Sequence, residues 1–207
     1  MIANSGGTIA GNGTLTGNGT IINTGTIEAV ADQTLGAQRL VVRNDLSGAG
    51  VLIIDPGATL VLSGQVQTQS IQFVANSSSQ LSNNPFSPST LVLNAPSLVT
   101  GSPISGFTFA DRLVLNNFVA VGTPSYAGGI LTVNQAGGGS PFIVALSGTL
   151  PGDLAGLDPI ATVVGSTTTI SFVAPSGGIA PGVLAPGTLR GAIGVRVLVP
   201  DLSLIHI

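Results

Sequence analysis

Hydrophobic and polar residues alternate over short segments of this 207-residue chain, and turn residues separate the segments. Near the N-terminus a Gly-Thr-Ile or Gly-Thr-Leu triplet recurs every six residues. The triplets begin at Gly7, Gly13, Gly19 and Gly25. Because six is an even number, their aliphatic residues have the same parity along an extended chain, and we expect them to share one face. These residues are Ile9, Leu15, Ile21 and Ile27.

The same style of pattern continues toward residue 100, with apolar residues at every second position and turn sequences such as DPGA (55–58) between the segments. The predicted strands are LVVRN (40–44), VLIID (51–55), ATLVL (58–62), VQTQSIQFV (66–74) and STLVLN (89–94). Short strands and turns at a small fixed period are typical of a solenoid. We therefore predict β-solenoid repeats over residues 1–100.

The second half of the chain is less regular. Residues 101–150 carry larger apolar side chains and are predicted to continue the solenoid or to form a β-rich repeat module. Residues 151–201 are rich in Pro and Gly and are predicted to be an irregular β region, in which TVVGSTTTISFV (162–173) forms a strand pair or one long strand. The last six residues, LSLIHI (202–207), resemble a translated sequencing-library adapter, and we expect them to be a non-native tail on a fragment of a longer protein. The alternative is a natural terminal β-strand.

Composition strengthens the all-β prediction. Charged residues make up only 6% of the chain, there is no lysine, and Glu28 is the only glutamate. Strong helix formers are therefore scarce, whereas Val, Ile, Thr and turn residues are abundant. The predicted fold class is an all-β parallel β-solenoid with a less regular, Pro/Gly-rich C-terminal β region.

Charge and residue usage also exclude several kinds of partner. The net charge is −3 and the five arginines are scattered, so we expect no nucleic-acid binding. The chain has no cysteine, which excludes disulfides and thiolate metal sites. Gly and Pro interrupt every long uncharged stretch, so we expect no membrane-spanning helix within this segment.

Five stretches in this order resemble one protein family: GTIINTGTIEA, LSGAGVLIIDPGATLVLSGQV, PISGFTFADRLVL, YAGGILTV and VALSG. They are similar to the passenger-like repeats of bacterial autotransporters and filamentous-haemagglutinin-like adhesins, over about residues 7–150. The resemblance implies a parallel β-solenoid in a large cell-surface or secreted protein. In relatives ISGF usually leads into two acidic residues, whereas here only Asp111 remains and Val114 replaces the second. A calcium site at this turn is therefore not expected.

A solenoid of this kind has a predictable size. With about 20 residues in each rung, residues 7–150 would form about seven rungs. We expect open edges at both ends of the stack, because a fragment would lack the caps that natural solenoids carry.

The sequence offers little catalytic chemistry. The only histidine, His206, lies in the terminal tail, and no Lys or Cys is present to act as a nucleophile. The acidic residues are Glu28, Asp32, Asp45, Asp55, Asp111, Asp153, Asp158 and Asp201. Only Glu28/Asp32 and Asp153/Asp158 are close in sequence, and we interpret both pairs as solvated turns or strand ends, and Asp55-Pro56-Gly57 as a turn. We predict no catalytic, cofactor-binding or metal-binding residue, and no cofactor.

Other motifs are interpreted as structural. GNGTLTG (11–17) repeats and precedes no helix pattern, so it is a set of solenoid corners rather than a phosphate loop, and GGGS (137–140) is a hairpin tip. The Asn-X-Ser/Thr triplets at Asn12, Asn18 and Asn76 are expected by chance in an Asn- and Thr-rich chain.

The function expected from the resemblance is that of a stalk or adhesive passenger segment, extracellular or at the outer membrane, without catalysis. Its partners would be glycans, matrix or neighbouring rods. The alternatives are a carbohydrate-active β-solenoid enzyme domain, which would concentrate acidic or basic residues on one face, and a self-assembling surface or matrix protein. A transmembrane β-barrel is disfavoured because the aromatic residues are too few for two girdles.

Overall fold

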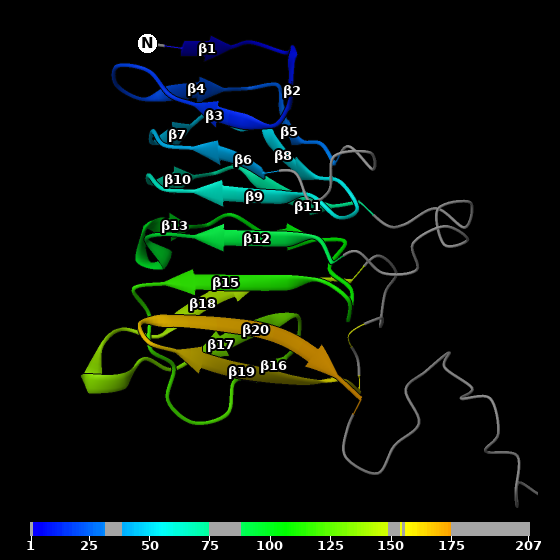
Figure 1. Cartoon of the computed structure of the whole chain (residues 1–207), viewed down its shortest axis with the longest axis vertical. Coiled ribbons are helices and arrows are strands. Elements are labelled where there is room, and N and C mark those ends of the chain that lie inside the picture. Colours follow the sequence, from blue (N-terminus) through cyan, green and yellow to red (C-terminus); the bar gives the residue numbers. More distant parts are fainter. Residues whose placement is uncertain (1, 32–38, 75–87, 149–153, 155, 175–207) are drawn as a thin grey trace, which may run out of the picture.

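The computed structural model describes residues 2–31, 39–74, 88–148, 154 and 156–174. Within these residues the chain is all-β and forms a parallel β-solenoid of about four turns, followed by antiparallel strands (Figure 1). This confirms the predicted all-β parallel β-solenoid.

The solenoid has three sheets, which we call faces A, B and C, and each turn contributes one strand to each face. Face A consists of β1 (Ile2–Asn4), β4 (Ile21–Asn23), β7 (Leu46–Ser47), β10 (Val66–Gln67) and β13 (Val99–Thr100). Face B consists of β2 (Thr8–Gly11), β5 (Thr26–Ala29), β8 (Val51–Ile54), β11 (Ser70–Phe73) and β14 (Ile104–Ser105). Face C begins with β3 (Gly13–Leu15), β6 (Arg39–Val42), β9 (Thr59–Leu62), β12 (Thr90–Leu93) and β15 (Arg112–Asn116).

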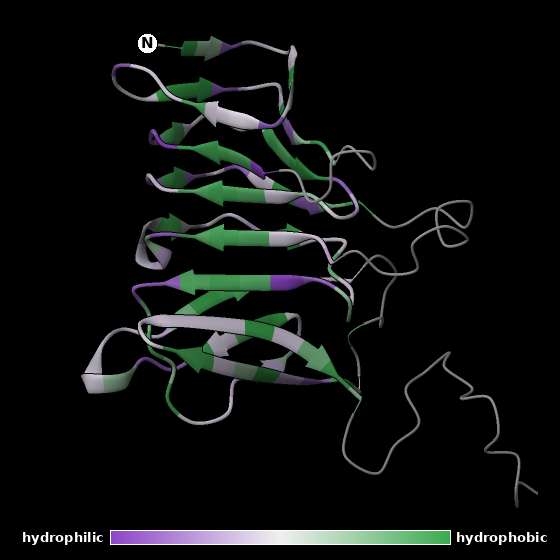
Figure 2. Ribbon diagram, in the orientation of Figure 1, coloured by the Kyte–Doolittle hydropathy of each residue, from purple (hydrophilic) through white to green (hydrophobic). Residues whose placement is uncertain are grey.

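Alternation within each strand explains why these sequences stack. In β5, β8, β11 and β12 the second and fourth residues are buried and the others are more exposed. Parallel pairing places like residues directly above one another, so Leu40, Leu60, Leu91 and Leu113 form one inward column on face C. Figure 2 shows β9 and β12 coloured as hydrophobic along most of their length, whereas β3 in the first turn is pale. The core is a stack of aliphatic columns that removes apolar surface from water.

Each six-residue unit of the repeat supplies one strand and the corner beside it, so successive units lie on successive faces. Thr8 pairs with Thr26, so three six-residue units complete one turn. The four aliphatic residues of the repeat all contribute to the interior, but they lie on faces B, C, A and B in succession. The expectation that they share one face is therefore wrong. Parity does fix which side of the strand is inward, but glycine-containing corners rotate the chain to the next face after each unit.

The predicted number of about seven rungs is also wrong, for two reasons. First, some turns are longer than 20 residues, since Leu60 pairs with Leu91 in the next turn. Second, parallel stacking ends at β15, and the following strands pair in the antiparallel sense.

At the C-terminal end of the stack, face C continues into antiparallel strands. Strand β20 (Thr167–Val173) pairs antiparallel with β15 and with β19 (Asp158–Val164), which confirms the strand pair predicted at 162–173. A second antiparallel sheet consists of β16 (Ser125–Ala127), β17 (Ile130–Val133) and β18 (Phe142–Ala145). The 3-10 helices are η1 (Pro96–Leu98), before β13, and η2 (Ala136–Gly138), between β17 and β18.

Aromatic side chains fill the space under the last turn. The ring of Phe107 packs edge-on against Phe73 at 5.0 Å and Phe172 at 5.9 Å, and Tyr126 meets Phe172 at 5.3 Å. Edge-to-face pairs at these distances stabilise beyond their buried area. At this end the expectation of an open edge is therefore wrong for face C, whereas face A ends at β13. At the other end, β1, β2 and β3 are the terminal strands of their sheets, and Ile2, Ile9 and Leu15 are only partly buried.

Candidate functional site

A ladder of amides lies inside the solenoid where faces A and B meet, which we call the A–B corner. Asn4 Nδ2 donates to Asn23 Oδ1 at 2.8 Å, and Asn23 Nδ2 donates to Gln69 Oε1 at 2.8 Å. Gln69 Nε2 also donates to Ser47 O at 3.1 Å and to Gly48 O. Asn23 and Gln69 are 0% exposed, so each amide depends on these partners. No short motif in the sequence marks these three residues as neighbours, because they come from different turns of the stack.

Glycine makes this ladder possible. A Cβ at Gly50 would lie 2.2 Å from Asn23 Nδ2 and 2.7 Å from Gly25 O, and one at Gly25 would lie 2.2 Å from Gly7 O. These backbones approach closely because Thr26 N donates to Gly7 O and Val51 N donates to Gly25 O. The glycines of the repeat are therefore packing positions of the A–B corner.

A second polar ladder runs along the outside, where faces C and A meet, which we call the C–A corner. Asn94 Nδ2 donates to Ser63 Oγ at 2.8 Å, and Asn116 Nδ2 donates to Asn94 Oδ1 at 2.7 Å. Thr167 Oγ1 then donates to Asn116 Oδ1 at 3.0 Å, so the ladder passes from the solenoid into the antiparallel strands. These groups are only partly buried, and they present a row of uncharged polar atoms.

A shallow hollow of about 540 Å³ opens on the same side of the molecule, beside face A. Thr20, Asp45, Ser47, Gln65 and Gln67 supply its polar side chains. Asp45 Oδ1 accepts a hydrogen bond from Gln65 N at 2.7 Å, which fixes the carboxylate at the rim. Ile22, 37% exposed, supplies an apolar surface beside these groups.

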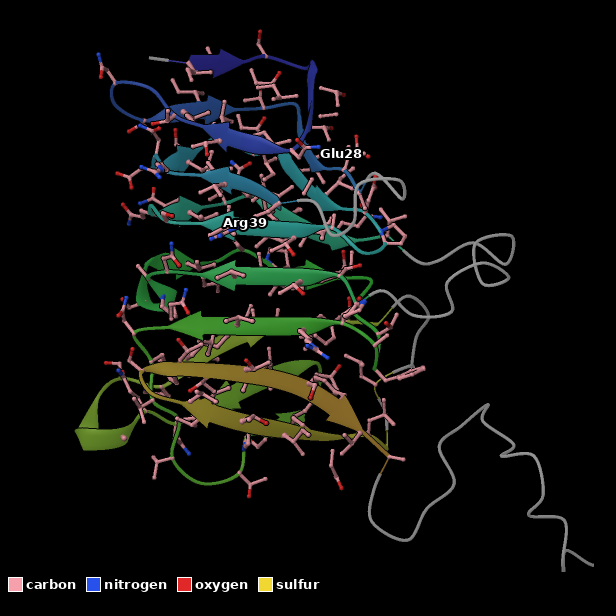
Figure 3. The ribbon with its side chains drawn as sticks, in the orientation of Figure 1. Glu28 and Arg39 are labelled. Atoms are coloured by element: carbon pink, nitrogen blue, oxygen red, sulfur yellow. The ribbon has the colours of Figure 1, made fainter. Side chains whose placement is uncertain are left out.

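Two carboxyl groups meet where faces B and C join, which we call the B–C corner. Glu28 is in β5 and Asp55 follows β8 one turn further on, and their side chains share a hydrogen bond. Burial raises the pKa of both groups, and the charge of Asp55 raises that of Glu28 further. The interaction between the two side chains raises the pKa of Glu28 and lowers that of Asp55, so the two carboxyl groups hold their protons with different affinities. Figure 3 shows Glu28 near this edge and Arg39 on face C.

The carboxyl group that Glu28 meets is distant in the sequence. The sequence drew attention to Glu28/Asp32, but Asp32 lies outside the described residues. The predicted turn at Asp55-Pro56-Gly57 is confirmed, since Ala58 N donates to Asp55 O at 2.9 Å and Gly57 has φ +80°. That turn also carries the carboxyl group that reaches Glu28. Only the register of the stack, in which Glu28 pairs with Ile53, indicates that Asp55 is close.

Asp111 accepts hydrogen bonds within the B–C corner. It is 6% exposed and accepts hydrogen bonds from Thr108 N and Thr108 Oγ1, both at 2.8 Å, and from Ser89 N at 3.2 Å. Burial raises its pKa, while these hydrogen bonds act in the opposite direction. Ser89 Oγ in turn donates to Asp55 O at 3.1 Å. Asp111 thus links consecutive turns.

The carboxyl pair gives a pH-dependent prediction. The folded-state pKa of Glu28 lies above its ordinary value of 4.5. Between pH 4.5 and this raised pKa, the folded protein therefore holds a proton on Glu28 that the unfolded chain has released. We expect the contribution of Glu28 to stability to be greatest below pH 4.5 and to fall as the pH rises through the raised pKa. Glu28→Gln should flatten this fall, modestly because water screens partly exposed groups. Urea unfolding at a series of pH values measures it.

Asp158→Asn is the control, because Asp158 is an exposed acid at the start of β19, away from the pair. An unchanged pH slope in Glu28→Gln, or an equal change in Asp158→Asn, would contradict the assignment.

The other predicted residues are placed as follows. Asn12 and Asn18 are exposed, and GGGS lies in the connection between the antiparallel strands β17 and β18. Asp153, Asp201, His206 and Asn76 lie outside the described residues, as does the tail 202–207. Within the described residues no three His, Cys, Asp or Glu side chains come together as metal ligands.

Comparison with known proteins adds no relative: no protein-family model, curated protein or solved structure matches the chain. In the described part of the chain, no helix is both long enough and apolar enough to cross a bilayer.

Proposed function

We propose that this chain is a stalk or adhesive passenger segment of a large bacterial cell-surface or secreted protein, similar to autotransporter and filamentous-haemagglutinin-like passengers, and that it acts without catalysis. The observation that supports this most is the parallel stack itself. A solenoid with aliphatic columns inside and uncharged Asn, Thr, Ser and Gln outside is a stiff rod that can display polar groups at fixed spacing.

Adhesion would use the C–A side of the rod. The hollow near Ser47 and Gln67 offers hydroxyl, amide and carboxylate groups around one exposed aliphatic residue, Ile22. Such a mixture suits a sugar, which has hydroxyl groups at its edges and apolar C–H groups on its faces. A few placed polar groups around an apolar patch is also the usual composition of a small-molecule site. Glycans are therefore the ligand class proposed for the adhesive role.

The proposal predicts a gain of adhesion on display at a cell surface. The chain is fused to a signal peptide and a translocator barrel in a bacterial host, with the barrel alone as the reference. We expect passenger-bearing cells to bind glycan-coated or matrix-coated surfaces severalfold better. Gln67→Ala should reduce this binding, and Gln72→Ala, an exposed glutamine on face B, is the matched control. Adhesion equal to the barrel alone, on every surface, would leave only the stalk role.

The pair Glu28–Asp55 is the observation that favours the carbohydrate-active alternative, because paired carboxyls with different proton affinities are the machinery of glycosidases. Purified protein is incubated with a panel of polysaccharides, and new reducing or unsaturated ends are measured. We expect none. Cleavage that disappears in both Glu28→Gln and Asp55→Asn would overturn the non-catalytic proposal.

A further inference from the structure

A cleft lies between the last turn of the solenoid and the antiparallel β16–β17–β18 sheet. The two are joined near Ile104, which forms a parallel bridge with Leu146. Ser147 N donates to Ile104 O at 2.9 Å, and Phe107 N donates to Ser147 O at 3.0 Å. Upstream of this bridge, residues 99–103 and 143–145 run side by side without pairing. A hollow of about 410 Å³ lies between them, and a second of about 450 Å³ continues it past Phe118 and Phe142.

Both walls of this cleft are the edges of sheets. Strand β13 is the last strand of face A, and β18 is the last strand of the β16–β17–β18 sheet. Leu146 N donates to Gly129 O on the β17 side, whereas Ser147 N donates to the β14 side. Since antiparallel hydrogen bonds alternate along a strand, the N–H and C=O groups of Ile143 and the N–H of Ala145 face the cleft, whereas the C=O of Ala145 belongs to the bridge with Ile104. Edge groups of this kind are templates for another strand.

A buried hydroxyl points to the same place. Ser102 lines the cleft and is 4% exposed, and its Oγ has no hydrogen-bond partner. Ile71 pairs with Ile104, so Ser102 occupies the position in its turn that Gln69 occupies one turn earlier. The internal amide ladder of the A–B corner therefore ends at Ser102. A buried polar group without a partner is costly, and it requires an explanation.

We propose that this cleft binds an extended, uncharged polypeptide segment as an added β-strand between β13 and β18. Among the described residues that line it none is charged, and Ile143, 57% exposed, offers an apolar contact at its mouth. Such binding combines backbone hydrogen bonds with side-chain pockets. It does not rest on the adhesive role, whose hollow lies against β4, β7 and β10 of face A.

The pairing register of face A predicts which residue types the bound peptide should carry. Ile21, Leu46, Val66 and Val99 form one inward column, so the added strand places an aliphatic residue beneath Val99. Two residues after Ile21 comes Asn23, which joins the amide ladder in its own turn. In the added strand, an Asn at this position supplies the partner that Ser102 lacks. The segment GTIINTG, residues 19–25, has this pattern and no charge.

The test uses acetylated, amidated GTIINTG with a fluorophore as the probe and the full chain as the receptor. We expect saturable binding by fluorescence anisotropy. Ser102→Ala should weaken it about tenfold while raising the melting temperature of the free protein, because the unpartnered hydroxyl is removed. Replacing the probe's Asn by Leu should cost a similar factor for the wild type and nothing further for Ser102→Ala.

Backbone pairing is tested separately. Ile143→Pro removes an N–H that faces the cleft, at an edge position where proline is tolerated, and should abolish binding, whereas Ile143→Thr keeps the N–H and should retain it. Thermal melts verify that each variant folds. No saturable binding by the wild type, equal affinity for Ser102→Ala and wild type, or displacement of the probe by an uncharged oligosaccharide would overturn the proposal.

Discussion

Gly106→Ala should destabilise the protein by about 3 to 5 kcal/mol. Gly106 lies between β14 and β15 with φ +72°, and a Cβ there would lie 2.0 Å from Phe73 O and 3.1 Å from the Phe73 carbonyl carbon. Neither atom can move without breaking the stack, because Phe73 belongs to β11 of the turn above and its ring packs on Phe107. The substitution therefore adds a backbone clash to the strain of a left-handed conformation.

Gly122→Ala separates these two effects. Gly122 has nearly the same φ, +70°, but a Cβ there meets nothing within 4 Å. The free energy of unfolding of this variant should fall only by the conformational cost of an alanine in the left-handed region, about 1 kcal/mol. Urea unfolding followed by circular dichroism measures both free energies of unfolding. Equal losses in the two variants would show that the corner between β14 and β15 can open, contrary to the packing described.

Asn23→Ala should cost about 3 kcal/mol in the free energy of unfolding. The substitution takes the acceptor from Asn4 Nδ2 and the donor from Gln69 Oε1, and these groups stay buried in the A–B corner. It also leaves a cavity beside Gly50, whose missing side chain makes room for the Asn23 amide. A buried amide that loses its partner cannot form a hydrogen bond to water instead, so the free-energy cost is large.

Asn116→Ala is the matched control, because it removes the same amide from the outer ladder. Asn116 also bridges two partners, Asn94 and Thr167, but it is only partly buried and water can replace it. The expected loss is about 1 kcal/mol or less. Chemical denaturation of both variants, side by side with wild type, gives the comparison. A smaller loss for Asn23→Ala than for Asn116→Ala would be inconsistent with an inner ladder that carries stability.

The chemistry of the B–C corner shows how a candidate site can escape sequence analysis. Glu28 and Asp55 are far apart in the chain, and the DPG motif explains Asp55 fully as a turn residue. They meet because parallel pairing places Glu28 beside Ile53. Once the length of each turn is known, this contact follows. The turns differ in length, so the sequence period alone did not reveal it.

The sequence by itself determined the fold class and the interior. Alternating apolar residues, Gly and Asn at the corners and the near absence of charge are local properties, and each acts through parity, turn conformation or desolvation. Tertiary structure decided the number of turns, the face on which each repeat lies, the antiparallel continuation of face C and the pairing of Glu28 with Asp55. These depend on which turn stacks on which. Registers such as Leu60 with Leu91 arise from the packing of whole columns, which no short stretch of sequence contains.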